Sequence, residues 1–182
     1  MHLHRGERSC RHVIPPLLIV LREKVVYVND MVSYTGKPYL TYTSNVPVWQ
    51  LDGTTVTALG ANLKVPIERV PGTPIVVKYV YSQPSVQNGL GGRILFYLDL
   101  LPVGHGDSYV ATSRRWWVNP LVAGVNISMT TDGMEVPPEL LDGRASSVDL
   151  SLVFGRQGDH ILDSSDSDCY LIKVIFEYWA YQ

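Results

Sequence analysis

The run CYLIKVIFEYWAYQ (169–182) restricts the fold more than any other part of this sequence. It is rich in β-branched and aromatic residues and contains neither glycine nor proline, which is typical of a β-strand. Alternate residues of an extended chain share a face, and one face of this run carries Tyr170, Ile172, Val174, Phe176, Tyr178 and Ala180. The other face carries Lys173 and Glu177 among Leu171, Ile175, Trp179 and Tyr181. The first face suits a core, whereas the second is too apolar for open water and too charged for a core.

The length of this run also restricts the topology. Twelve extended residues span roughly 40 Å, about twice the length of an ordinary strand. Because the run comes last in the sequence, its partners in a sheet must come from earlier segments, so the pairing is non-local. Greek-key sandwiches, including jelly rolls, have this property.

The same two-residue alternation recurs along the chain, while helical periodicity is almost absent. Turn signals such as Asp52-Gly53, Pro71-Gly72 and Asp142-Gly143 separate the runs. One short helical turn is expected at 137–141, which begins with two prolines. This spacing predicts an all-β, antiparallel β-sandwich of the jelly-roll type. The expected strands are 25–28, 38–43, 46–51, 55–59, 63–69, 73–82, 92–101, 108–112, 124–130, 146–154 and the closing run.

The 182 residues suit one domain, which we expect to consist of an N-terminal arm (1–24) and a sandwich (25–182). The apolar run 13–21 is interrupted by two prolines and is shorter than the roughly 20 residues of a membrane span. We therefore expect no membrane span and no cleaved signal segment. Cys10 and Cys169 form no disulfide pattern and are expected to be idle thiols.

The first 12 residues of the expected arm are polar and basic. Arg5, Arg8 and Arg11 stand against one acidic residue, and arginine forks match phosphate oxygens, so these residues are candidate nucleic-acid contacts. The net charge of −2 gives no global basic field. A solvated tail without a partner is the alternative.

The acidic loop DHILDSSDSD (159–168) is a candidate calcium site. Asp163, Asp166 and Asp168 could supply several of the oxygens that calcium requires. The spacing is not that of an EF-hand, and a solvated hairpin loop is the alternative. No other cofactor is expected.

Two cations stand beside two large aromatic residues at 114–117. Arg114, Arg115, Trp116 and Trp117 are candidate interface residues, together with Trp179, because tryptophan and arginine are enriched at binding hot spots. On a strand the two adjacent tryptophans point to opposite faces, so at most one belongs to the core. The exposed one could also stack on a base or a sugar, or lie under a neighbouring loop.

Nothing in the sequence indicates an enzyme. His105, Asp107 and Ser108 are neighbours in GHGDS, but a catalytic triad needs a particular placement in space that neighbours on a loop seldom have. A nucleophile elbow, an HExxH motif and a phosphate-binding glycine loop are all absent.

The last third of the sequence has a strand (VDLSLVFGRQGD), then a polar loop (HILDSSDSD) and then a terminal aromatic strand (CYLIKVIFEYW), with GGRILFYLDLLPVGHGDSYVAT upstream. In this order of elements it resembles the closing part of single jelly-roll capsid (coat) proteins of small icosahedral viruses. The resemblance implies a structural protein that self-assembles in many copies into the shell of a virion. The arm has only three arginines in its first dozen residues, fewer than RNA-packaging arms usually hold.

Assembly of such a shell would cover the half-apolar second faces of the closing strand and of 93–101 with neighbouring copies. Two alternatives fit the same sandwich. One is a trimeric attachment domain, such as a fibre head, that binds a host receptor or glycan. The other is a carbohydrate-binding module.

Overall fold

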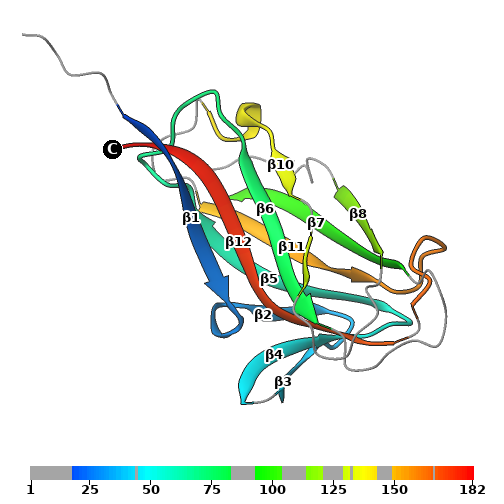
Figure 1. The fold of residues 1–182 in the computed structure, drawn as a ribbon. Helices are drawn as coiled ribbons and strands as arrows, with labels where there is room; N and C mark the ends of the chain where they lie inside the picture. The colour runs from blue at the N-terminus through cyan, green and yellow to red at the C-terminus, as the bar shows by residue number, and fades with distance from the viewer. Residues whose placement is uncertain are drawn as a thin grey trace, which may run out of the picture.

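The computed structural model describes residues 18–43, 45–82, 93–103, 114–120, 129–131, 133–142, 149–165 and 167–182. Two antiparallel sheets stack face to face in a sandwich (Figure 1), which confirms the predicted fold class. The described residues include two single 3-10 turns, η1 (Val28–Asp30) and η2 (Pro138–Leu140). The second turn lies within the helical turn expected at 137–141. No described helix is long and apolar enough to cross a membrane.

The first sheet has seven strands and is built around the last one. Strand β12 pairs along one edge with β6, and along the other edge first with β4 and then with β1. This arrangement confirms that the closing run pairs with distant segments. The strands are β1 (Ile19–Tyr27), β3 (Tyr39–Thr43), β4 (Val46–Leu51), β6 (Ile75–Ser82), β9 (Met129–Thr130), β10 (Met134–Val136) and β12 (Cys169–Tyr181).

The second sheet has five strands in the order β2-β5-β11-β7-β8. Its strands are β2 (Val32–Thr35), β5 (Val56–Lys64), β7 (Arg93–Val103), β8 (Arg114–Pro120) and β11 (Asp149–Gln157). The separate strand expected at 63–69 is wrong. Lys64 ends β5, and within the following loop only Arg69 forms a bridge, to Ala180.

The core lies between the two sheets and is rich in aromatic rings. Phe96 of β7 lies between two tyrosines of β6, with ring centroids 5.3 Å from Tyr79 and 4.8 Å from Tyr81. The Tyr79 hydroxyl donates a hydrogen bond of 2.8 Å to the Tyr97 carbonyl oxygen. A buried hydroxyl needs such a partner, and this bond also links the two sheets.

A β-bulge changes which face of β12 enters the core. The register against β6 shifts between Leu171 and Lys173. Beyond the bulge, Val174, Phe176, Tyr178 and Ala180 are buried as expected. Before it, the odd-numbered Cys169 and Leu171 are buried instead. The prediction that one unbroken even-numbered face is the core is therefore wrong before the bulge, because the extra residue reverses the alternation.

The second face of β7 is buried within the chain itself. Leu95 and Tyr97, which we expected a neighbouring copy to cover, are 0% and 1% exposed. Tyr97 forms a small cluster with Ala58 and Val153 on the far side of the five-stranded sheet. The expectation of an intersubunit contact at 93–101 is corrected for these two residues.

Strand β1 begins inside the segment expected as an arm. Residues 19–24 pair with β12 and belong to the seven-stranded sheet in the structure. Residues 1–17, with Arg5, Arg8, Arg11 and Cys10, lie outside the described part of the chain.

Candidate functional site

Four large apolar side chains form a stripe on the outer face of the seven-stranded sheet. The stripe lies where β1 runs beside the end of β12, and Figure 1 shows these two strands side by side. Leu21 pairs with Trp179, and Ile19 pairs with Tyr181. These four side chains, the outer stripe, are 54%, 45%, 47% and 38% exposed respectively. Directly opposed residues of paired strands share a face, so the four side chains form one continuous surface.

Charged residues border the outer stripe on the same face. Glu177, two residues before Trp179, accepts a hydrogen bond of 2.6 Å from the Lys78 ammonium group of β6. Glu23 of β1 stands opposite Glu177 in the register. The stripe is thus an apolar surface with a charged margin, as in many protein interfaces.

A polar cleft of about 280 Å³ opens at the opposite end of the same sheet. Tyr39 and Tyr170 both stand directly opposite Gln50, so the three residues form one row across β3, β4 and β12. Tyr39 is 54% exposed. The cleft is lined by Gly36, Lys37, Tyr39, Gln50, Asp52, Thr55 and Asp168.

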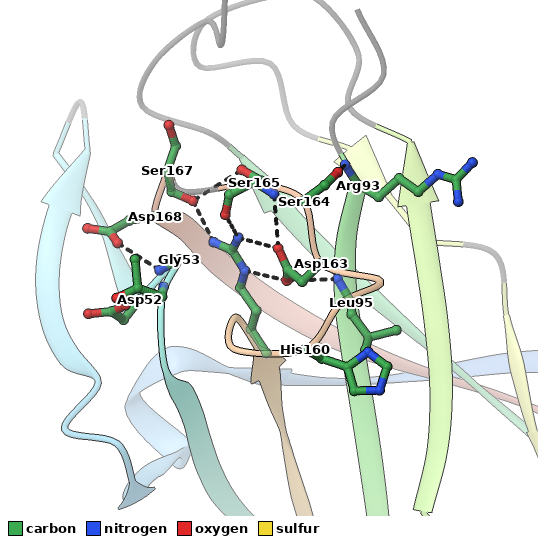
Figure 2. A network of polar contacts seen from close by, with 12 residues as sticks. Asp52, Gly53, Arg93, Leu95, His160, Asp163, Ser164, Ser165, Ser167 and Asp168 are labelled. Carbon is green, nitrogen blue, oxygen red and sulfur yellow. Dashed lines mark hydrogen bonds and ion pairs between the residues drawn. The ribbon is translucent and has the colours of Figure 1, made fainter. Parts of the chain in front are cut away.

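Hydrogen bonds hold both carboxylates of this cleft in place (Figure 2). Asp52 Oδ1 accepts bonds from the backbone N–H groups of Thr54 and Thr55, at 2.6 and 3.1 Å, and from the Thr54 hydroxyl at 2.7 Å. The Thr54 backbone bond is the main reason that the pKa of Asp52 lies below its usual value. Asp168 accepts a bond from the Gly53 N–H at 3.0 Å and another from the Gln50 side-chain amide.

A buried ion pair lies beneath the loop that leads to β12 (Figure 2). Asp163 accepts two hydrogen bonds from Arg156, and both side chains are 0% exposed. The Arg156 guanidinium also donates to the carbonyl oxygens of Ser165 and Ser167. The ion pair itself has no exposed surface, so it fixes the loop and offers no binding site to a ligand.

The candidate calcium ligands lie in different surroundings. Asp163 faces Arg156, Asp168 belongs to the polar cleft, and Asp166 lies outside the described residues. Among the side chains that the structure describes, no three His, Cys, Asp or Glu residues come close enough together to hold a metal ion. Calcium binding by this loop stays a prediction.

The other predicted site residues are only partly described. Arg114, Arg115, Trp116 and Trp117 lie on β8, in register with Asp99, Leu98, Tyr97 and Phe96 of β7. Their role as interface residues stays a prediction. Trp179 lies in the outer stripe, whereas His105, Asp107 and Ser108 lie outside the described residues.

Cys169 is a free thiol that is completely buried. Burial raises its pKa to about 12, so the thiol is protonated and inert at neutral pH. Cys169 is therefore a buried thiol, as expected, and its lack of a chemical role stays a prediction.

Two features of the structure escaped the sequence analysis. Arg156 continues the apolar alternation of Leu152 and Phe154, and a cation at a core position could have indicated a buried ion pair. The polar cleft combines Lys37 and Tyr39 with Asp168, more than a hundred residues apart. Only the pairing of the strands brings these residues together, so no pattern in the local sequence could have indicated the cleft.

Comparisons with known proteins identify no family. No family model and no curated protein matches this sequence. A family 29 carbohydrate-binding module from Piromyces equi superposes with a TM-score of 0.47 at 12% identity, covering 87% of this chain and 91% of that one.

Two further similar structures come from different kinds of protein. A mannan-recognising family 27 carbohydrate-binding module superposes with a TM-score of 0.43 at 14% identity, covering 88% of this chain and 98% of that one. A chain of infectious bursal disease virus, Gx strain, superposes with a TM-score of 0.38 at 10% identity, covering 87% of this chain and 33% of that one.

Proposed function

We propose that this chain is a structural protein that self-assembles through the outer stripe. The observation that carries the proposal is the cross-strand pairing of Leu21 with Trp179, which leaves two large apolar side chains about half exposed on a sheet face. Tryptophan and tyrosine dominate the centres of protein interfaces. A neighbouring copy that covers the stripe would remove these side chains from water.

The size of the stripe suits the centre of an interface. Its four side chains expose roughly 400 Å², within the range of about 300–600 Å² for the largest patch on a typical monomer, which is often functional. A specific interface buries roughly 800 Å² on each partner. Tyr27, which is 57% exposed at the end of β1, and the charged margin can supply the remaining area.

The kind of assembly that we propose is the shell of a virus, with the chain as a coat subunit in the virion and without enzymatic activity. The antiparallel sandwich supports this, as does the sequence resemblance of its last third to single jelly-roll coat proteins. In a closed symmetric shell the same modest contact repeats many times, so a patch of this size is sufficient. An arm that contacts the viral nucleic acid belongs to the same proposal.

The test is sedimentation and electron microscopy of the full chain over a range of salt and pH. We expect closed megadalton particles from the wild type. The Leu21→Ser and Trp179→Ser double variant should sediment as small species. The matched control is Ile161→Ser, because Ile161 is 92% exposed on a loop away from the stripe and its replacement should leave assembly unchanged.

The same measurement separates the alternatives. A compact trimer without nucleic acid would indicate an attachment domain instead of a shell protein. A monomer under every condition, or particles from the double variant like those of the wild type, would contradict assembly through the stripe.

A further inference from the structure

The polar cleft has features of a binding site that the assembly proposal does not use. Gly36 and Lys37, which form one wall, both have left-handed backbone conformations, with φ of +71° and +52°. A side chain on Gly36 would overlap the backbone oxygen of Val56, so the loop packs tightly on β5. This wall of the cleft is therefore held against β5 before any ligand arrives.

The hydrogen bonds inside the cleft leave a defined set of groups for a ligand. Asp52 Oδ1 accepts three bonds from its own turn, and the described residues provide no donor to Oδ2. Gln50 donates its amide N–H to Asp168, which leaves the side-chain carbonyl oxygen to accept a bond. The Lys37 ammonium group and the Tyr39 hydroxyl add donors, and neither has a hydrogen-bond partner among the described residues.

An aromatic platform adjoins these polar groups. Tyr39 is 54% exposed, and Tyr170 follows it across Gln50 in the same row. Burial raises the pKa of Tyr170, and Tyr39 and Asp168 add to this shift because their charges lie nearby. Two aromatic rings therefore lie on the same face, beside acceptors and donors, and they suit a ligand that has both an apolar surface and hydroxyl groups.

The charge of the cleft narrows the class of ligand. Two carboxylates face one ammonium group, so phosphates and other anions are repelled. Both oxygens of Asp168 already accept hydrogen bonds, and the described residues provide no third His, Cys, Asp or Glu to complete a metal site. The cleft therefore favours neither an anion nor a metal ion, and a neutral molecule that is rich in hydroxyl groups suits it better.

We propose that the cleft formed by Lys37, Tyr39, Gln50 and Asp52 binds a neutral sugar. The sugar ring stacks on Tyr39, and its hydroxyl groups donate to Asp52 Oδ2 and Gln50 and accept from Lys37. The volume of about 280 Å³ lies near the roughly 300 Å³ lower bound of small-molecule sites. It therefore suits one ring of a chain that continues toward Tyr170.

The experiment is native electrophoresis of the full chain in agarose gels, whose pores admit both large particles and free subunits. The gels contain neutral polysaccharides (xyloglucan, galactomannan or dextran) or anionic ones (polygalacturonate or heparin). We expect at least one neutral polymer to retard the wild type and the anionic polymers to have no effect. Tyr39→Ala should weaken retardation at least about tenfold, because an aromatic anchor is lost. Lys37→Met should weaken it several-fold.

The matched control is Tyr42→Ala. Tyr42 lies on the same strand as Tyr39 but on its opposite face, and it is 69% exposed, so its removal should change nothing. A thermal melt of each variant checks that the fold is intact, and Lys37→Met decides the outcome if Tyr39→Ala does not fold. The proposal fails if no neutral polymer retards the wild type, if only anionic polymers do, or if the cleft variants bind like Tyr42→Ala.

Discussion

Arg156 and Asp163 form a two-point ion pair from which water is completely excluded. The guanidinium Nε lies 2.8 Å from Oδ2 and Nη2 lies 2.7 Å from Oδ1, and neither side chain has any exposed surface. Asp163 Oδ2 also accepts a bond of 3.0 Å from the Leu95 backbone N–H. One carboxylate thus joins the loop before β12 to both β11 and β7.

Removing the charge of Asp163 should destabilise the fold strongly. In the Asp163→Asn variant the Arg156 cation stays buried without its partner, and such changes cost about 3–5 kcal/mol. Urea denaturation measures this as a loss of free energy of unfolding. The control is Lys78→Met, which breaks the partly exposed pair with Glu177 and should cost about 1 kcal/mol or less. Equal losses in the two variants would contradict the importance of the buried pair.

Truncating Phe96 should be among the most damaging changes in the core. Phe96 has no exposed surface and contacts the rings of Tyr79 and Tyr81, so Phe96→Ala leaves a cavity between the sheets and costs roughly 3–5 kcal/mol. Tyr42→Ala, at an exposed position, should stay within about 0.5 kcal/mol of the wild type. Both values come from urea denaturation monitored by circular dichroism.

Two glycines of the five-stranded sheet should respond in opposite ways to alanine. A methyl group on Gly155 of β11 would overlap the backbone oxygen of Thr57, so Gly155→Ala must push β5 away and lower the melting temperature. A methyl group on Gly60 of β5 would meet Val32 at an ordinary 3.5 Å. Gly60→Ala should therefore be neutral or slightly stabilising. An unchanged melting temperature of Gly155→Ala would contradict the close approach of β11 to β5.

The stability of the protein should fall in alkali, and Tyr81 should contribute to the fall. Burial raises the pKa of Tyr81 from 10.0 to about 12. The unfolded chain therefore releases this proton first, and the stabilisation, complete below pH 10, is lost as the pH rises to 12. Tyr81→Phe lacks the proton, so its unfolding midpoint in urea should decline less steeply over this interval. An identical slope in both proteins would contradict the prediction.

The sequence predicts the layers of this fold better than its details. Alternation in β6 places Ile75, Val77 and Tyr79 in the core, where they are buried, because burial on one face of a sheet forces a two-residue period. The bulge near Leu171 could not be predicted, since it depends on how β12 meets β6. The residue types around the bulge are those of an ordinary strand, so they do not indicate an extra residue.

The candidate surfaces were predictable to different degrees. Trp179 was expected at an interface because its strand has a second apolar face, and the structure leaves it 45% exposed. Its partner Leu21 was expected in the arm, because two prolines interrupt the apolar run that contains it and the run was therefore not interpreted as a strand. The polar cleft depends on three strands that meet in register, which a single sequence does not determine.

The position of β12 has a consequence for biosynthesis. Strands β1, β4 and β6 all pair with β12, so each has an unpaired edge until residues 169–181 leave the ribosome. Until then these edges need protection from aggregation. Trp179 and Tyr181 are synthesised on this same segment. A nascent or truncated polypeptide that lacks this segment therefore lacks half of the outer stripe, and with it the contact between copies that we propose.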